Sequence, residues 1–191
     1  MRAIDIVLLP PDDIMSLVVE LNGAGVKTNQ ATIPLDLKNR IPHLSLLMGV
    51  LDDEQYARVQ ESLHIIAKQY GPVKALFDTA KDTAFFTPNT GDVQALHRAI
   101  LGKVDPLLTH SVTPDMFLEP AGTVFPSDFD HWVNTFVTEH SLEAFQPHIT
   151  VHTQTPIEYV LPFWCSFTRL AVCHLGVYNT CREIIAEYRL E

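Results

Sequence analysis

One five-residue pattern occurs twice in this chain, and it constrains the fold more than any other feature. Residues 42–46 read PHLSL and residues 147–151 read PHITV, so each copy has a proline, a histidine, an aliphatic residue, a hydroxyl residue and a second aliphatic residue. β-Branched side chains favour extended backbone, and proline can begin a strand but disrupts a helix interior. Both copies therefore predict a strand, one in each half of the chain.

The histidine and the hydroxyl residue of each copy lie on the same face of the predicted strand. Side chains two residues apart share a face, so His43 lies with Ser45 and His148 lies with Thr150, while the aliphatic residues between and after them point into the core. If the two strands face each other, two imidazoles and two hydroxyls form a small site with approximate two-fold symmetry. These four residues are the candidate site.

A zinc site is an alternative interpretation of the second copy, because His148 and His152 are four residues apart. On a helix they would share one face, but on a strand such residues are separated by about 13 Å, too far to bind one ion. The HExxH pattern of helical zinc sites also lacks its glutamate here. We therefore expect no metal and no other cofactor. On the strand, His152 either lines the site beside His148 or lies in solvent at the strand end.

Two histidines and two hydroxyls suit the cleavage of a phosphodiester. One group must take a proton from the attacking water or hydroxyl, and another must give a proton to the leaving oxygen on the opposite side of phosphorus. Histidine can do either near neutral pH, because its pKa is about 6.5. The hydroxyls of Ser45 and Thr150 can donate hydrogen bonds to the non-bridging oxygens. The pattern predicts that His43 and His148 are the catalytic pair, without assigning which of them is the base.

The charge of the chain favours a small ligand over a long nucleic acid. The formal net charge is −10, and the stretch from Val104 to Thr168 contains eight acidic residues but neither lysine nor arginine. A protein that grips a long nucleic acid needs several Lys or Arg contacts to phosphates. We therefore expect the partner to be a small nucleotide or a short oligonucleotide, bound by a few directed hydrogen bonds.

Composition indicates a globular protein without a membrane anchor. The 191 residues are 47% hydrophobic, yet no apolar run approaches the ~20 residues that a membrane span needs. The three cysteines, Cys165, Cys173 and Cys181, are an odd number without a CxxC pair, which indicates reduced thiols and a cytoplasmic protein. The oligomeric state is left open, with a monomer among the options.

Helix and strand patterns alternate along the chain. Apolar residues at helical spacing predict one helix that begins near residue 12 and ends at Gly23 and Gly25, and two more over residues 52–70 and 91–104. A further helix is expected to begin at Ser127, where Ser-Asp-Phe-Asp is similar to a capping box. Apolar or alternating runs predict strands over residues 3–9, 41–50, 73–80, 83–87, 145–153, 169–178 and 182–190. The strands over residues 73–80 and 83–87 are expected to pair with each other. Residues 105–125 have no periodicity. Because no linker interrupts the series, we expect a single α/β (α+β) domain over residues 1–191.

At these residues the sequence resembles the 2H phosphoesterase superfamily, whose members carry two His-x-Ser/Thr-x motifs and which includes bacterial LigT-like 2'-5' RNA ligases and cyclic nucleotide phosphodiesterases. The resemblance covers most of the chain: an opening strand that ends in prolines, PHLSL on a strand, a following helix, FQPHITV, and a terminal hairpin like LAVCHLGVYNTCREIIAEYRL. LigT-like members often have an arginine soon after the second motif, where this chain has His152 and Thr153.

The resemblance implies a bilobal fold of two antiparallel sheets with helices packed outside, a pseudo-two-fold axis and a central cleft. It implies catalytic roles for His43 and His148 and phosphate contacts for Ser45 and Thr150. The expected activity is metal-independent hydrolysis of a cyclic phosphate or a 2'-5' phosphodiester. The alternatives are an RNA 2'-5' ligase or RNA end-processing enzyme, and a nucleotide-binding module of the same fold without turnover.

Overall fold

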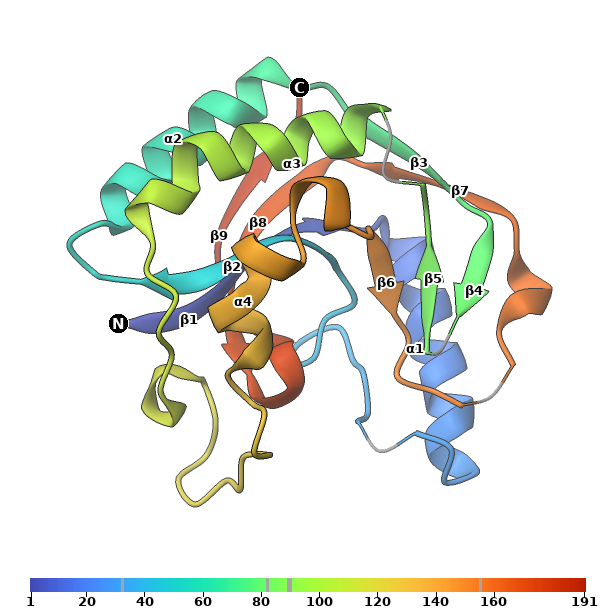
Figure 1. The fold of residues 1–191 in the computed structure, drawn as a ribbon. Helices are drawn as coiled ribbons and strands as arrows, with labels where there is room; N and C mark the ends of the chain where they lie inside the picture. Colours follow the sequence, from blue (N-terminus) through green and yellow to red (C-terminus); the bar gives the residue numbers. More distant parts are fainter. Residues whose placement is uncertain (32, 82, 89–90, 155) are drawn as a thin grey trace.

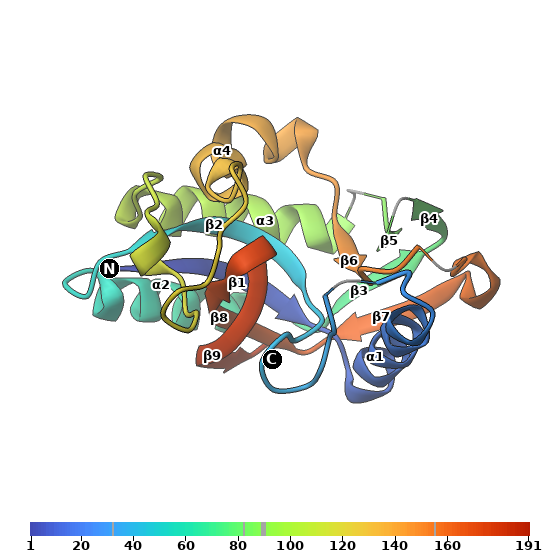
Figure 2. The same ribbon diagram turned by 90° about the horizontal axis from the view of Figure 1, so that it is seen from below.

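The computed structural model describes residues 1–31, 33–81, 83–88, 91–154 and 156–191. Within these ranges the regular structure consists of four α-helices, nine β-strands and short 3₁₀ turns. All strand pairs are antiparallel, and helices lie on the outside of the sheets (Figures 1 and 2). The predicted α+β class with antiparallel sheets is confirmed.

A four-stranded sheet of order β2-β1-β8-β9 forms the first lobe. Its strands are β1 (Arg2–Leu9), β2 (Leu44–Leu51), β8 (Arg169–Gly176) and β9 (Thr180–Arg189). On one face of β1, Ile4, Ile6 and Leu8 join the main core, which also contains the buried faces of α2 (Tyr56–Gln69) and α3 (Gly91–Val104). On the other face, Val7 and Leu9 belong to a small second cluster. The sheet is therefore packed on both faces.

Two smaller sheets form the second lobe. β3 (Val73–Phe77) pairs with β7 (Phe163–Phe167), and β5 (Ala84–Phe86) lies between β4 (Thr79–Lys81) and β6 (His148–Thr150). The predicted pairing of residues 73–80 with 83–87 is correct only for β4 and β5. The strand breaks at Asp78 because residues 73–77 pair with β7, a segment for which the sequence predicted no structure. The ring of Phe163 contacts Phe77 and Phe85 and so joins the two sheets.

The first helix is longer than the sequence predicted. α1 (Asp12–Lys27) continues through Gly23 and Gly25, where it was expected to end. A Cβ atom at residue 25 would collide with the side chain of Thr153, so glycine allows the helix to approach the segment that follows β6. Gly25 is therefore a packing residue and not a helix stop. In both views α1 lies beside the strands of the second lobe (Figures 1 and 2).

The last helix begins later than predicted. α4 (His131–Glu139) is preceded by turns at residues 127–130, and no side chain caps it. The expected capping box at Ser127 is wrong, because the carboxylate of Asp130 accepts a hydrogen bond from the Asn134 side chain instead of from the helix backbone. α4 packs against β2. Residues 105–125 are irregular, as predicted, apart from 3₁₀ turns at Asp105–Leu107 and Pro114–Met116.

The cysteine prediction is wrong for two of the three residues. A disulfide bond joins Cys173 on β8 to Cys181 on β9, and only Cys165 is a free thiol. The sequence could not show this pairing, because the two cysteines meet only when the terminal hairpin forms and brings their Cα atoms to 5.4 Å. Among the described residues, no helix has the length and apolar character to cross a membrane.

Candidate active site

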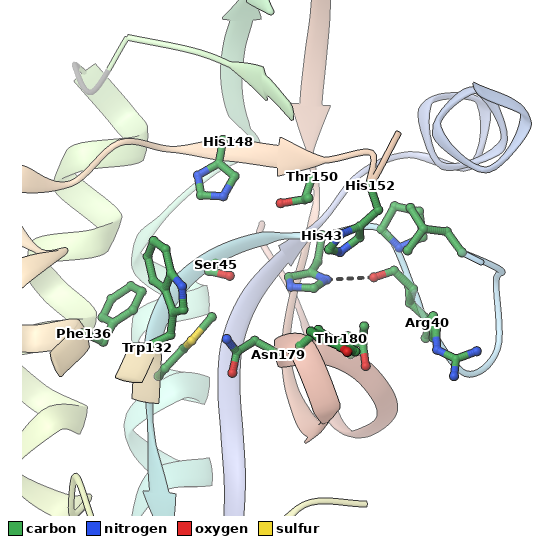
Figure 3. A pocket seen from close by; sticks show the side chains of 16 residues that line it. Arg40, His43, Ser45, Trp132, Phe136, His148, Thr150, His152, Asn179 and Thr180 are labelled. Carbon is green, nitrogen blue, oxygen red and sulfur yellow. Dashed lines mark hydrogen bonds between the residues drawn. The ribbon is translucent and has the colours of Figure 1, made fainter. Parts of the chain in front are cut away.

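The two motifs line one pocket between the lobes. His43 directly precedes β2 and Ser45 lies on it, whereas His148 and Thr150 lie on β6, and all four side chains line the same cavity (Figure 3). The alternation follows the expected strand pattern, because Ile149 is fully buried between two partly exposed neighbours. The structure therefore brings together all four residues that the sequence singled out.

Both imidazoles are oriented by the same local contact. The Nδ1 atom of His43 lies 2.7 Å from the carbonyl oxygen of Ile41, and the Nδ1 atom of His148 lies 2.8 Å from that of Gln146. In each case the partner is the residue two positions earlier, so the backbone conformation of the motif itself fixes the ring. A carbonyl oxygen can only accept, and Nδ1 therefore carries a proton in both rings. This leaves Nε2 of each histidine as the nitrogen that can exchange a proton with a ligand.

A buried aspartate that the sequence analysis did not select completes the site. Asp5 on β1 is fully buried, and its Oδ2 atom lies 2.6 Å from Oγ of Ser45 and 3.5 Å from Nε2 of His43. Its Oδ1 atom has no hydrogen-bond partner among the described residues. The sequence signal was a lone acid within the apolar strand AIDIVLL. Within the described ranges no carboxylate forms an equivalent ion pair with His148, so the site is not symmetric in charge.

The two catalytic candidates differ in pKa. Burial alone would lower the pKa of His43, but its hydrogen bond to Asp5 and the charge of that carboxylate outweigh burial and raise it above the usual value. Burial lowers the pKa of His148, and the nearby charge of His43 lowers it further. Burial raises the pKa of Asp5 in spite of its contact with His43. The shift in pKa therefore favours the charged form of His43 and the neutral form of His148.

His152 lines the pocket and does not lie in solvent at the strand end, so the first of the two expectations for it is correct (Figure 3). It lies two residues after the end of β6 and has a positive φ of 54°, a backbone conformation that few residues other than glycine and asparagine adopt. Burial, together with the charges of His43 and His148, lowers the pKa of His152 to about 4. It is therefore a neutral, polar part of the pocket wall at physiological pH.

Among the described residues, one group of three His, Cys, Asp or Glu side chains could hold a metal ion, and it lies on α4 and the residue after it, away from the motifs. His131, Glu139 and His140 offer ligand atoms that all lie within 4.8 Å of one another. His148 and His152 do not belong to such a group in the part of the chain that the structure describes.

Asn22 on α1 holds two of the segments that form the pocket. Its Nδ2 atom donates to the carbonyl oxygens of Val151 at 3.0 Å and of Ile33 at 2.9 Å, and its Oδ1 atom accepts from the backbone N–H of Leu35 at 2.7 Å. The side chain is 1% exposed. A polar residue on the buried face of a predicted helix is the signal that could have identified it. Asn22 thus ties the end of β6 to the loop before the first motif.

Aromatic and basic side chains form the rest of the wall. Trp132 on α4 and Tyr178 in the turn between β8 and β9 are 41% and 54% exposed, and both line the pocket. Arg40 lies at the same cavity, next to the first motif (Figure 3). A second cavity, lined by Lys81 and Phe86 among others, shares Ser45, Trp132, Phe136, His148 and Thr150 with the first. The cleft therefore extends to both sides of the second motif.

Comparisons with known proteins identify the fold. No family model and no curated protein matches the sequence. Among solved structures, TT0787 of Thermus thermophilus is similar over 99% of this chain and 98% of its own, with a TM-score of 0.60 and 14% identity. E. coli LigT complexed with NADP⁺ is similar over the same shares of the two chains, with a TM-score of 0.53 and 11% identity. The resemblance to LigT-like proteins noted from the motifs is thus confirmed for the fold.

Proposed function

We propose that this protein is a phosphoesterase of the 2H superfamily that hydrolyses a cyclic phosphate or a 2'-5' phosphodiester in a small nucleotide or short oligonucleotide. One observation carries the proposal. Two histidines from different lobes, each with Nδ1 bonded to a carbonyl oxygen, line one pocket together with two hydroxyl residues. The fold shared with LigT, over nearly the whole of both chains, supports it.

The reaction uses the two Nε2 atoms on opposite sides of phosphorus. One neutral imidazole takes a proton from water as the water oxygen bonds to phosphorus. The bond from phosphorus to the leaving ribose oxygen breaks, and the other imidazole, in its protonated form, gives that oxygen a proton. The hydroxyl of Thr150 donates to a non-bridging oxygen and stabilises the negative charge that develops there. The products are a phosphate monoester and a free hydroxyl, and the two histidines have exchanged protonation states.

The pocket wall supports a nucleotide as the substrate. Trp132 and Tyr178 present exposed rings on which a base can stack, and Arg40 supplies a positive charge beside the motifs. The structure of E. coli LigT holds NADP⁺, which is a small nucleotide. The net charge of −10 disfavours a long nucleic acid, which needs many cationic contacts.

A substrate panel tests the proposal. Purified protein is incubated with 2',3'-cyclic nucleotides, cyclic ADP-ribose derivatives, 2'-5' dinucleotides and RNA with a terminal cyclic phosphate, each with and without a chelator because of the potential ligand group on α4. We expect turnover of at least one small substrate in chelator, and its loss in His148→Gln. Binding without product would favour a nucleotide-binding module. Activity on the RNA alone, with a steep salt dependence, would favour RNA end processing or ligation.

A further inference from the structure

We propose that Asp5 is a positioning residue that keeps His43 in the imidazolium form, so that His43 is the general acid and His148 the general base. This inference rests on the proposed phosphodiesterase function and assigns the two roles that the motifs leave open. It concerns a residue outside both motifs, on the central strand of the first lobe.

The placement of Asp5 gives its carboxylate few partners. The residue is fully buried, on the face of β1 that also carries Val7 and Leu9, and its backbone lies opposite Met48 of β2 and Cys173 of β8. A charged group in such surroundings is costly unless it is paired and hydrogen-bonded. The polar side chains in contact with it are Ser45 and His43. A buried carboxylate in contact with both residues of one motif is difficult to explain as a packing residue.

The hydrogen-bond geometry favours the charged form of His43. Its Nδ1 atom faces the carbonyl oxygen of Ile41 at 2.7 Å, and its Nε2 atom faces Oδ2 of Asp5 at 3.5 Å. When Asp5 is ionised, both neighbours of the ring are oxygens that only accept. A neutral imidazole has one proton, so one ring nitrogen would direct its lone pair at an oxygen. Only the imidazolium can donate in both directions.

His148 lies in different surroundings. Its Nδ1 atom donates to the carbonyl oxygen of Gln146, but no ion pair with a carboxylate is found for its Nε2 atom within the described residues. The neutral ring satisfies its single contact and leaves the Nε2 lone pair free to accept a proton from water. The pKa directions of the two histidines agree with this assignment, since the pKa of His43 is raised and that of His148 is lowered. Burial raises the pKa of Asp5, and the contacts with His43 and Ser45 oppose that shift.

The other titratable groups at the cavity do not replace Asp5. Those that line the pocket with His43 are Arg40 in the preceding loop, His148 and His152 on the opposite lobe, and Tyr178 in the turn after β8. A positive charge on either histidine or on the arginine would disfavour a second positive charge on His43, so these groups cannot take the place of the Asp5 carboxylate. Asp5 is the one described residue that forms an ion pair with it.

The two hydroxyl residues also acquire different roles. The hydroxyl of Ser45 donates to Asp5 at 2.6 Å, so it helps to hold the carboxylate in the ionised form. The hydroxyl of Thr150 makes no hydrogen bond within the described part of the chain and can donate to a non-bridging oxygen. When His43 gives its Nε2 proton to the leaving oxygen, the ion pair with Asp5 is lost, and a proton from solvent restores it after product release.

The experiment compares Asp5→Asn with Asp105→Asn. Asn is nearly isosteric with Asp, and Asp105 provides a matched control because it pairs with His110 at 2.7 Å away from both cavities. The ring protons of His43, identified with His43→Gln, are titrated by NMR without substrate, and kcat/KM is measured against pH. We expect His43 to titrate above about 6.5 in the wild type and at least one unit lower in Asp5→Asn, with a loss of about tenfold in kcat/KM at pH 8. Asp105→Asn should leave the titration of His43 and the value of kcat/KM unchanged.

An unchanged titration of His43 in Asp5→Asn would overturn the inference, whatever the activity. If Asp5→Asn does not fold, the wild type decides: a His43 pKa below that of His148 would overturn the assignment, and one above it would support it. The NMR titration needs no turnover, so it tests the Asp5–His43 pair even if every substrate in the panel fails. If Asp5→Asn turns over substrate and its kcat/KM falls at alkaline pH as in the wild type, the phosphodiesterase function stands but Asp5 does not have the proposed role.

Discussion

His43 and His148 have the same backbone contact but opposite shifts in pKa. The shared contact comes from the motif, in which Nδ1 bonds to the carbonyl oxygen two residues earlier. The difference comes from a third residue, Asp5, that only the folded sheet brings to one of them. At the scale of single residues, the site is thus symmetric in its local construction and asymmetric in its electrostatics.

The most direct residue-scale prediction concerns the two histidines. We expect His43→Gln and His148→Gln each to lower kcat by about 10²-fold or more, because each removes one proton-transfer partner. Circular dichroism should show an unchanged fold. His64→Gln on the exposed face of α2 is the control and should retain full activity. Undiminished turnover in either motif variant would argue against its catalytic assignment.

The hydroxyl of Thr150 offers a second residue-scale prediction. It has no hydrogen-bond partner among the described residues, so Thr150→Val removes a donor to the substrate without breaking a bond in the fold. We expect kcat to fall by about 10- to 100-fold, with a change in the free energy of unfolding below about 1 kcal/mol. Kinetics and urea denaturation measure the two effects. A loss of stability with no loss of kcat would mean that Thr150 is structural.

The sequence predicted the four motif residues because they lie on strands, where a period of two fixes which side chains share a face. Asp5 and Asn22 could not be assigned in the same way. Asp5 is a lone acid among apolar neighbours on β1, and Asn22 is the one polar side chain on the buried face of α1. The role of each depends on a partner that is distant in the chain, Ser45 for Asp5 and Val151 for Asn22. Such a residue can be noticed in a sequence, but its partner cannot be identified there.

At the scale of elements, α1 shows how tertiary contact overrides local preference. Gly23 and Gly25 suggested a helix end, yet the helix continues through both, and the close packing against Thr153 explains why residue 25 is glycine. Tertiary contacts also determine where strands end. The strand breaks at Asp78 because residues 73–77 pair with β7, and β6 is three residues long because it pairs with the three residues of β5. Local patterns located most elements, whereas their ends depended on neighbours.

The two glycines of α1 provide a matched pair of variants. A Cβ atom at residue 23 meets nothing within 4 Å, so Gly23→Ala should stabilise the protein by about 0.5–1 kcal/mol through helix propensity. Gly25→Ala introduces a collision with Thr153 and should destabilise it by about 1–3 kcal/mol. Urea denaturation compares them. Equal stability of the two variants would contradict the packing role of Gly25.

At the scale of the whole molecule, several buried histidines couple stability to pH. The pKa values of His97, His148 and His152 are lowered, each mainly by burial. A histidine whose pKa is lowered in the folded state binds fewer protons there than in the unfolded chain. It therefore reduces the free energy of unfolding as pH falls through the range between about 6.5 and its folded pKa. His43, whose pKa is raised, has the opposite effect.

His152 should contribute strongly to this acid sensitivity, because its pKa is lowered to about 4. We expect His152→Asn, in which asparagine tolerates the positive φ, to lose less stability than the wild type between about pH 6.5 and pH 4. Urea denaturation at about pH 7 and about pH 4.5 gives the comparison. Parallel losses in the two proteins would show that His152 is not buried as described.

The arrangement of the two lobes places one histidine motif on each side of a single pocket, and this is the central claim of the account. The measurement that tests it most directly is the pH dependence of kcat/KM for the wild-type protein on its best small substrate, in the presence of a chelator. We expect a bell shape. The rate should fall below about pH 6.5 as His148 becomes protonated, and fall again above about pH 6.5 as His43 loses its proton. A rate that is flat from acid to alkaline pH would contradict the two-histidine mechanism.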